Sequence, residues 1–221
     1  MTSSSTSVGL LAQTEDVLAH LPISGTSEYR KDEIIYGQGR ASNNIYLVVA
    51  GCVGLSHVTQ EGREVLLDII PSDEIFGESA FLGPPRPSEQ AVAIKAATIM
   101  KWSVSDIEEL VEVRPRLAIA LLQILARRNA ELACRIGSFA GDCVERRLAR
   151  SLVFLSERLG TTEADGSVSM MPLTHGQLSQ YIGTSREIVT HFMGQFRRRG
   201  HVSYSRRVIQ LRPKELRAVL D

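Results

Sequence analysis

The segment IFGESAFLGPPRPSEQAVA combines residue types that could bind a phosphorylated ligand. Gly77 and Glu78 stand near its start, and Arg86 and Ser88 follow near its end. Free backbone N–H groups at the start of a short helix, one guanidinium and one hydroxyl can together hold a phosphate, while a glutamate can accept hydrogen bonds from a sugar. The alternative is a proline-rich surface loop in which Arg86 pairs with Glu78 or Glu89. These residues alone leave both interpretations open.

A second segment, LTHGQLSQYIGTSREIVTHFMGQFRRRG, places two short amphipathic stretches on either side of a Gly-Thr-Ser turn. Thr174 is a good N-cap for the first stretch, and Thr184 precedes Glu187 with capping-box spacing at the start of the second. The pair predicts a helix-turn-helix, whose second helix enters the major groove of DNA through its first turns. A plain helical hairpin is the alternative, because terminal arginines also suit a helix dipole. The predicted buried face of the second helix comprises Ile188, Val189, Phe192, Met193 and Phe196.

The chain then continues as HVSYSRRVIQLRP, which alternates like a small β-hairpin with Arg206 and Arg207 at its turn. A helix-turn-helix followed by a basic hairpin predicts a winged helix-turn-helix, and it weakens the case for a plain helical hairpin. The solvent side of the second helix carries, near its N-terminus, Arg186, Glu187, Thr190 and His191.

The charge distribution supports a nucleic-acid-binding C-terminal part. The 221 residues carry no formal net charge, and a hydrophobic fraction of 43% allows a packed core in one or two domains. Residues 1–141 hold 12 Lys and Arg against 17 Asp and Glu, whereas residues 142–221 hold 13 against 8. The two parts therefore carry −5 and +5. Such asymmetry indicates a DNA-binding domain joined to a domain with another role.

Cysteine content and the N-terminus argue against other classes of protein. Cys52, Cys134 and Cys143 form no CxxC pair and have no histidine at metal spacing, so no metal site is expected. The opening MTSSSTSVG lacks a basic n-region and a long apolar h-region, and no later run approaches about 18 apolar residues. The sequence therefore predicts a soluble cytoplasmic protein with reduced thiols and no membrane contact.

Residues 29–102 alternate as short strands separated by turns such as GQGRASN and TQEGR, with Gly51 among the glycines expected at turns or strand ends. The predicted strands are EIIY, NIYLVVAG, VGLSHV, EVLLDII, QAVAI and ATIMKW. Their spacing predicts an antiparallel β-roll, similar to a jelly roll. A metalloenzyme on such a barrel would need clustered histidines, but residues 20–110 contain only His20 and His57. We therefore expect no enzymatic activity.

The segment RPRLAIALLQILARRNAELACRIGSFAGD is long enough for a helix of about seven turns. Apolar residues recur at alternating spacings of three and four, with one asparagine at an a position, which predicts a parallel two-stranded coiled coil. The alternative is a helix packed on its own β-roll. Gly141 and Asp142, a candidate N-cap, then predict a hinge before the next helix, CVERRLARSLVFLSERLG. The predicted seam comprises Leu122, Leu125, Asn129, Leu132, Ile136 and Phe139.

The order of these elements, with FGES followed by PRPS and then SREIVTHFMGQFRRRG, resembles the CRP/FNR family of bacterial transcription regulators. The resemblance implies an α+β protein with an N-terminal antiparallel β-roll, a long dimerisation helix and a C-terminal winged helix-turn-helix. It also implies a homodimer that binds an inverted repeat in double-stranded DNA, with RNA polymerase as a further partner. The expected divisions are a tail at 1–20, the β-roll at 21–110, the dimerisation helix and hinge at 111–141, and the DNA-binding domain at 142–221.

The resemblance also implies an effector, a cyclic nucleotide or a related nucleotide. Glu78 would contact its ribose and Arg86 its cyclic phosphate, with Gly77 and Ser88 assisting. Leu132 and its neighbour stand where cyclic-AMP-binding members offer hydroxyls to the base, so weak discrimination among nucleotides is expected. Two alternatives are a regulator of the same family that needs no effector, and an interaction module that binds no DNA.

For DNA, the resemblance implies base contacts by Arg186 and Glu187, which suit guanine and cytosine respectively. His191 stands where many members have a second base-reading arginine, so the specificity at that base pair would be either relaxed or set by Thr190 and His191 together. Other polar residues would contact phosphates, which position the protein without reading sequence. They are Thr174, Ser185, Arg197 and Arg206.

Overall fold

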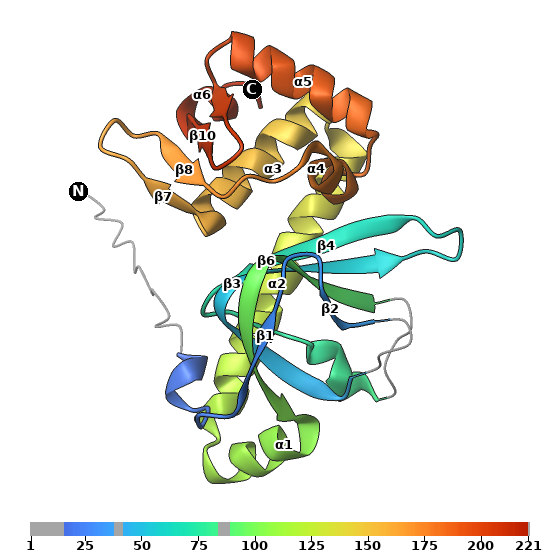
Figure 1. Cartoon of the computed structure of the whole chain (residues 1–221), viewed down its shortest axis with the longest axis vertical. Coiled ribbons are helices and arrows are strands. Elements are labelled where there is room, and N and C mark those ends of the chain that lie inside the picture. The colour runs from blue at the N-terminus through green and yellow to red at the C-terminus, as the bar shows by residue number, and fades with distance from the viewer. Residues whose placement is uncertain (1–15, 38–41, 84–88, 221) are drawn as a thin grey trace, which may run out of the picture.

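The computed structural model describes residues 16–37, 42–83 and 89–220. Figure 1 shows an N-terminal β-domain and a C-terminal helical domain, with the long helix α2 (Arg116–Gly141) running from one to the other. The predicted α+β architecture is confirmed: an antiparallel β-roll, a long helix and a winged helix-turn-helix follow one another along the chain.

Two long strands dominate the N-terminal sheet. β3 (Asn44–Val58) and β6 (Glu89–Ser103) pair along most of their length, and each joins two strands that the sequence predicted separately. The expectation for Gly51 was wrong, because this glycine lies inside β3 at an irregularity of the register. Its φ is +96°, and an added Cβ would lie 2.2 Å from the carbonyl oxygen of Ala96.

Shorter elements complete the β-roll. The strand order is β1-β6-β3-β4, with β2 on β6 and β5 on β3, and the sequence did not predict β1. The bounds are η1 (Val17–Ala19), β1 (Thr26–Tyr29), β2 (Ile34–Tyr36), β4 (Glu64–Pro71), β5 (Ile75–Phe76), η2 (Glu78–Leu82) and α1 (Val104–Val113).

Helix α2 has two different faces. One face packs on the β-roll through buried residues such as Leu117, Ala120 and Arg128, while the predicted seam is exposed in this single chain. The hinge differs from the prediction at Asp142, which ends α2 and does not cap α3 (Val144–Leu159). Its carboxylate is held instead by Arg150, whose Nε lies 2.8 Å from Oδ2.

The C-terminal domain combines four helices with a four-stranded sheet of order β7-β8-β10-β9. The predicted basic hairpin is present as β9 and β10, whereas the sequence did not predict β7 and β8, which are three residues each. The bounds are β7 (Gly160–Thr162), β8 (Val168–Met170), α4 (His175–Ile182), α5 (Arg186–Arg198), β9 (Val202–Tyr204), β10 (Ile209–Leu211) and α6 (Pro213–Arg217).

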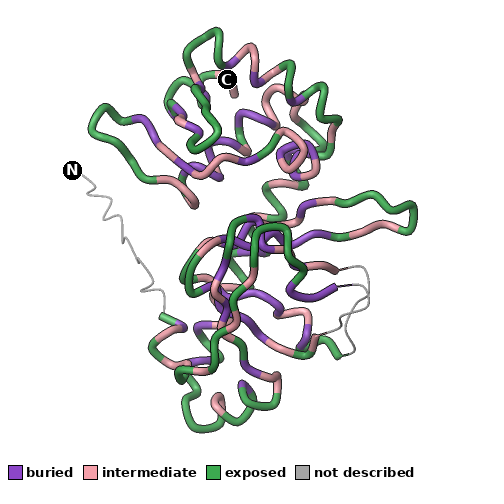
Figure 2. The backbone as a smooth tube through the Cα atoms, in the orientation of Figure 1, coloured by how far each residue is buried: buried purple, intermediate pink, exposed green. Residues whose placement is uncertain are grey.

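The hydrophobic core crosses the boundary between the two domains. One cluster joins C-terminal residues such as Leu152, Leu178 and Phe196 to residues of the β-roll, namely Cys52, Leu66, Ile69 and Ile94. Figure 2 shows buried backbone where the domains meet and an exposed tip on the β3–β4 hairpin. Within the described ranges, no helix is long and apolar enough to cross a membrane.

Candidate nucleic-acid interface and ligand cavity

Capping residues set the ends of the two helices in the helix-turn-helix. Thr174 caps α4 through a reciprocal capping box with Gln177, and Gly183 ends this helix at φ +65°. Ser185, and not the predicted Thr184, caps α5, because its backbone is extended and its hydroxyl accepts from an amide in the first turn. The hydroxyls of Thr174 and Ser185 are therefore used in caps, and their contacts with phosphates stay predictions.

The structure brings the four predicted base-contacting residues together on the exposed face of α5. Arg186, Glu187, Thr190 and His191 are all exposed, whereas Val189, Met193 and Phe196 are buried on the opposite side. Hydrogen bonds from its own backbone amide and from Ser185 hold the pKa of Glu187 below its usual value. Glu187 is thus a carboxylate acceptor at neutral pH, as a contact with cytosine N4 requires.

The hydroxyl of Thr190 both donates and accepts a hydrogen bond within the protein. It donates to the carbonyl oxygen of Arg186 at 2.8 Å, and Nδ1 of His175 lies 2.8 Å from the hydroxyl oxygen of Thr190. Because the hydroxyl proton is committed to the helix backbone, His175 must be the donor in the second bond. Burial, with a smaller effect of Arg186, lowers the pKa of His175, so its ring is neutral at neutral pH.

His175 and Tyr204 adjoin the candidate interface, and sequence reasoning missed both. The two rings meet edge to face with centroids 5.8 Å apart, and the Arg197 guanidinium lies 5.6 Å from the Tyr204 centroid. These contacts join the start of α4, the end of α5 and the hairpin strand β9. The alternating pattern around Tyr204 predicted the strand, but it carried no signal for the partners of this side chain.

Basic residues extend the exposed face toward the hairpin. Arg206 and Arg207 lie exposed in the β9–β10 turn, as the sequence predicted. Arg199 is tied back to the protein by an ion pair with Glu145, with Nη1 and Oε1 2.8 Å apart. On His191, Nε2 lies 2.8 Å from the side-chain amide nitrogen of Gln195, which can only donate, so Nδ1 is the ring nitrogen that carries the N–H.

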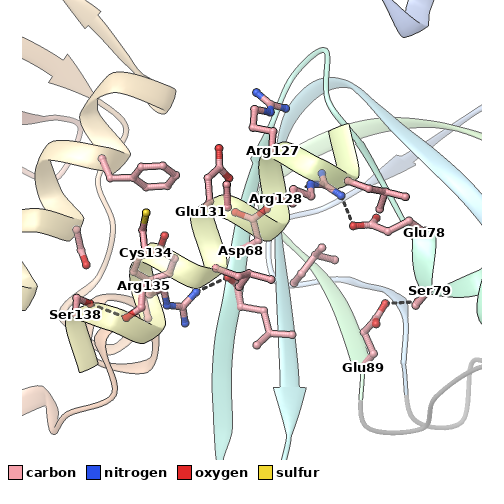
Figure 3. Close-up of a pocket in the computed structure, with 18 of the residues that line it drawn as sticks. Asp68, Glu78, Ser79, Glu89, Arg127, Arg128, Glu131, Cys134, Arg135 and Ser138 are labelled. Atoms are coloured by element: carbon pink, nitrogen blue, oxygen red, sulfur yellow. Dashed lines mark hydrogen bonds and ion pairs between the residues drawn. The ribbon is translucent and has the colours of Figure 1, made fainter. Parts of the chain in front are cut away.

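A cavity of about 790 Å³ lies between the β-roll and α2 and reaches α3 and α4 (Figure 3). Much of its wall is apolar, and two residues of the predicted seam, Leu125 and Leu132, also line it. The other leucine and phenylalanine side chains of the wall are Leu55, Leu67, Phe81, Leu82 and Phe154.

The predicted ligand-binding residues have different outcomes. Glu78 lines the cavity, and Gly77 precedes it at φ +88°, where an added Cβ would lie 2.7 Å from the Asn44 carbonyl oxygen. Arg86 and Ser88 lie outside the described residues. Glu78 forms an ion pair with Arg128 of α2, and the alternative pairing of Arg86 with Glu78 or Glu89 stays a prediction.

Arg128 was missed by sequence reasoning, although it is the cation at the centre of the cavity's polar end. Its side chain is 9% exposed, and it donates to Glu78 and to the carbonyl oxygen of Ile75. Asp68 and Glu74 lie within 3.8 and 3.9 Å of its nitrogens. The second carboxylate oxygen of Glu78 is buried and has no hydrogen-bond partner within the described part of the chain.

Glu89, at the first position of β6, is a second carboxylate in the cavity wall. Its Oε1 accepts from the hydroxyls of Tyr36 at 2.7 Å and Ser79 at 2.8 Å. Burial and the charge of Glu89 raise the pKa of Tyr36, so the phenol remains a donor. The sequence suggested Glu89 only as a partner for Arg86.

An ion cluster joins the cavity to the C-terminal domain. Arg158 of α3 contacts both Asp68 and Glu74, which lie 90 and 84 positions away in the chain. Nε of Arg158 is 3.1 Å from Glu74, and Nη2 is 3.2 Å from Asp68. Although burial alone would lower it, the hydrogen bonds with Glu74 and Asp68 raise the pKa of Arg158. Asp68 also lines the cavity.

The end of α2 contacts the helix-turn-helix of the same chain. Phe139 occupies the space beside Gly183, where an added Cβ would lie 2.8 Å from its ring. The Arg135 guanidinium lies 4.2 Å from the ring centroid of Tyr181 in α4 and donates to the carbonyl oxygen of Leu66 at 2.8 Å. The last residue of the predicted seam therefore also touches the turn between α4 and α5.

Comparison with known proteins matches both domains. Residues 26–114 match the cyclic nucleotide-binding domain family, and residues 146–219 match the Crp-like helix-turn-helix domain family. The transcriptional regulator SdrP of Thermus thermophilus is 32% identical over 182 residues, which cover 81% of this chain and 85% of SdrP. The CRP-like cAMP-activated global transcriptional regulator of Mycobacterium tuberculosis is 25% identical over 175 residues, 79% of this chain and 78% of that protein.

Solved structures give the same result. A CRP/FNR-family transcriptional regulator from Thermus thermophilus has a TM-score of 0.68 and 27% identity, over 89% of this chain and 98% of its own. FixK2 from Bradyrhizobium japonicum has a TM-score of 0.77 and 21% identity, over 89% and 97% of the two chains, and this likeness concerns the fold alone.

The ion cluster predicts a large loss of stability on removal of Arg158. Arg158→Ala removes the guanidinium that hydrogen-bonds both Asp68 and Glu74 and leaves them only the longer ion pairs with other arginines, such as Arg128, so the free energy of unfolding should fall by about 3 kcal/mol. The control is Arg217→Ala, which breaks an exposed pair with Glu157 and should cost less than about 1 kcal/mol. Urea denaturation measures both, and equal small losses would contradict a structural role for the cluster.

Proposed function

Because the chain belongs to the CRP/FNR family of bacterial transcription regulators, we propose that it works as a homodimer reading an inverted repeat in double-stranded DNA. Its DNA-binding domain is the winged helix-turn-helix. The observation that carries the proposal is the exposed face of α5. This face presents two charged side chains, Arg186 and Glu187, and two further polar ones, Thr190 and His191, and the opposite face holds the buried apolar residues. We also propose that it acts in the cytoplasm, with the DNA it regulates and with RNA polymerase as a partner.

Exposed apolar surface on α2 supports the homodimer. Leu122 and Ile136 are 66% and 68% exposed, and the other apolar seam residues are at least 40% exposed. An apolar stripe on a helix whose opposite face is already packed is unfavourable in water, and pairing with a second copy would bury it. Asn129, exposed on the same stripe, would fix the register of that pairing. Two-fold symmetry in turn requires an inverted repeat with half-sites about one DNA turn apart.

The contacts on α5 support different roles for its residues at the DNA, with some contacting bases and others contacting phosphates. A guanidinium can bond guanine bidentately and a carboxylate can accept from cytosine, so Arg186 and Glu187 are the proposed readers. His191 offers an N–H, held in that state by Gln195, to an acceptor on the next base. Arg197 and Arg206 are proposed phosphate contacts, and stacking on Tyr204 holds Arg197 near the hairpin.

For the effector we propose only a class of ligand. The β-roll matches a cyclic nucleotide-binding domain family, and its cavity reaches from η2 to the DNA-binding domain. If a cyclic nucleotide bound there, Glu78 would face a ribose hydroxyl, whereas the residue predicted for its phosphate, Arg86, lies outside the described residues. The cyclic nucleotide therefore stays a prediction, as does the alternative of a regulator without an effector.

The dimer predicts that charge on the seam gives monomers. The double variant Leu122→Glu and Ile136→Glu changes the two most exposed apolar positions of the seam, and neither residue lines the cavity. Repulsion and lost burial should dissociate the dimer in analytical ultracentrifugation. Val113→Glu, at a still more exposed apolar position in α1, should leave the mass unchanged. A seam variant that sediments as a full dimer would remove α2 from the interface.

Base reading predicts that two arginines of α5 behave differently. Arg186→Ala should cost about 1–3 kcal/mol on the preferred duplex and little on random duplex, because it removes a base contact. Arg197→Ala should weaken both and reduce the salt dependence, because it removes a phosphate contact. Fluorescence anisotropy at several salt concentrations separates the two. Equal losses for Arg186→Ala on both duplexes would exclude base reading, and no duplex binding at all would favour an interaction module.

The bonds made by Thr190 predict that it contacts DNA through its methyl group. With its hydroxyl proton donated to Arg186 and its oxygen accepting from His175, the side chain has no hydrogen-bond donor left for a base, and its methyl group is free for an apolar contact, such as one with the thymine methyl. Replacing that thymine by deoxyuridine should weaken binding about fourfold, near 0.8 kcal/mol for one methyl. Thr190→Val should retain this sensitivity and Thr190→Ser should lose it. Insensitivity of the unmodified protein to deoxyuridine throughout the half-site would disprove the contact.

A further inference from the structure

The imidazole of His175, at the first position of α4, contacts two other elements of the C-terminal domain. Its Nδ1 lies 2.8 Å from the hydroxyl oxygen of Thr190 in α5. Its ring also meets the ring of Tyr204 in β9 edge to face, with centroids 5.8 Å apart. One side chain therefore joins both helices of the helix-turn-helix to the basic hairpin.

The bond to Thr190 selects one conformation of that side chain. In a helix, threonine divides between two rotamers, because its hydroxyl can bond a backbone carbonyl oxygen of the preceding turn. Thr190 has the bonded rotamer and donates to the carbonyl oxygen of Arg186 at 2.8 Å. An N–H from His175 to the same hydroxyl stabilises this rotamer over the other, and it thereby fixes the direction of the Thr190 methyl group.

The neutral state of the ring suits this role. Burial, and to a smaller degree the charge of Arg186, lower the pKa of His175, so the ring carries a single N–H at neutral pH. Because the hydroxyl proton of Thr190 is given to the helix backbone, that N–H lies on Nδ1. A cationic side chain at this position would instead repel the Arg186 guanidinium, which is the proposed reader of a base.

The contact with Tyr204 acts on a different residue. The edge-to-face arrangement limits how the Tyr204 ring can tilt, since the edge of one ring is attracted to the face of the other. The Arg197 guanidinium lies 5.6 Å from the centroid of the same Tyr204 ring, within the reach of a cation–π contact. His175 therefore supports, through Tyr204, an arginine that is a proposed phosphate contact.

We propose that His175 is a positioning residue for DNA recognition. Through Thr190 it sets a base preference, and through Tyr204 it sets the strength of the phosphate contact made by Arg197. This role rests on the proposed function, because it concerns how residues of the regulator meet the duplex. It requires no contact between His175 and the DNA.

Two substitutions separate the two effects. His175→Phe keeps a ring beside Tyr204 and removes the N–H, whereas His175→Asn removes the ring and keeps an amide N–H near the position of Nδ1. Fluorescence anisotropy compares the preferred duplex, the same duplex with deoxyuridine at the thymine that Thr190 reads, and a random duplex. His57→Phe, the same change at an exposed position of β3, is the control and should alter none of the three affinities.

The two variants should differ in kind. His175→Phe should reduce the preference for thymine over deoxyuridine from about fourfold to about twofold or less, with random-duplex binding unchanged. His175→Asn should keep the thymine preference, weaken binding to all three duplexes about threefold and lower the salt dependence. A merely structural role would give both variants the same loss on every duplex, and that result would overturn the proposal.

A double-mutant cycle tests whether His175 acts through Thr190. Valine has one strongly preferred rotamer in a helix and no hydroxyl for His175 to hold. The double variant His175→Phe with Thr190→Val should therefore regain the thymine preference that His175→Phe loses. A double variant that remains as indifferent to deoxyuridine as His175→Phe would mean that His175 acts by another route, which would overturn the positioning role.

Failure of the proposed function would look different. An unmodified protein that binds no duplex, or that loses nothing specific with Arg186→Ala, would sink the base-reading regulator and the role of His175 together. If Arg186 reads a base but there is no thymine preference, or the preference survives His175→Phe, only the role of His175 is sunk. Without DNA, nitrogen NMR of the histidine rings should show His175 protonated on Nδ1, and protonation on Nε2 alone would also overturn it.

Discussion

The arrangement of the two domains depends on one pair of carboxylates, Asp68 and Glu74, which is shared by an arginine from α2 and an arginine from α3. Charges at such a site are stable only when their partners are in place, because an unpaired buried carboxylate is strongly unfavourable. Arg128 and Arg158 must therefore both remain beside the acids. The β-roll, the long helix and the DNA-binding domain are fixed to one another by this requirement, with the shared hydrophobic core around it.

The same pair gives the cavity a physical route to α5. Asp68 lines the cavity and also binds Arg158, while Arg128 binds Glu78 at the cavity's polar end. A ligand that changes the charge balance around Glu78 and Arg128 changes the field that holds Arg158 in α3. An effector shifts a conformational equilibrium only through different affinities for its two states. The ion cluster is where such a difference would arise, and the contact of Phe139 with Gly183 carries it to the turn before α5.

Local patterns in the sequence were sufficient for the elements but not for their partners. The periodicity of α2, the Thr174 cap and the basic hairpin all depend on near neighbours in the chain, so each could be predicted. The prediction of a turn or strand end at Gly51 was wrong, because this glycine lies at a register irregularity inside the long strand β3. The prediction of Asp142 as an N-cap was wrong, because its carboxylate binds Arg150, about two helical turns further along the chain.

The candidate sites divide in the same way. The face of α5 follows from helical spacing alone, so its four polar residues could be named in advance. Arg158 and Arg128 could not, because their partners are brought close only by the fold. His175 likewise has its partner on another helix, Thr190, and nothing in its own segment signals that bond.

The shared core has a consequence for synthesis of the protein. The nascent β-roll emerges from the ribosome before the C-terminal helices that pack against four of its apolar residues. These residues are Cys52, Leu66, Ile69 and Ile94. Until the C-terminal helices have been translated and have folded, these side chains form an exposed apolar patch that chaperones or other nascent chains can bind. The two domains therefore complete their folding together. A fragment cut at the hinge is prone to aggregate through the apolar surface that the other domain covers in the whole chain.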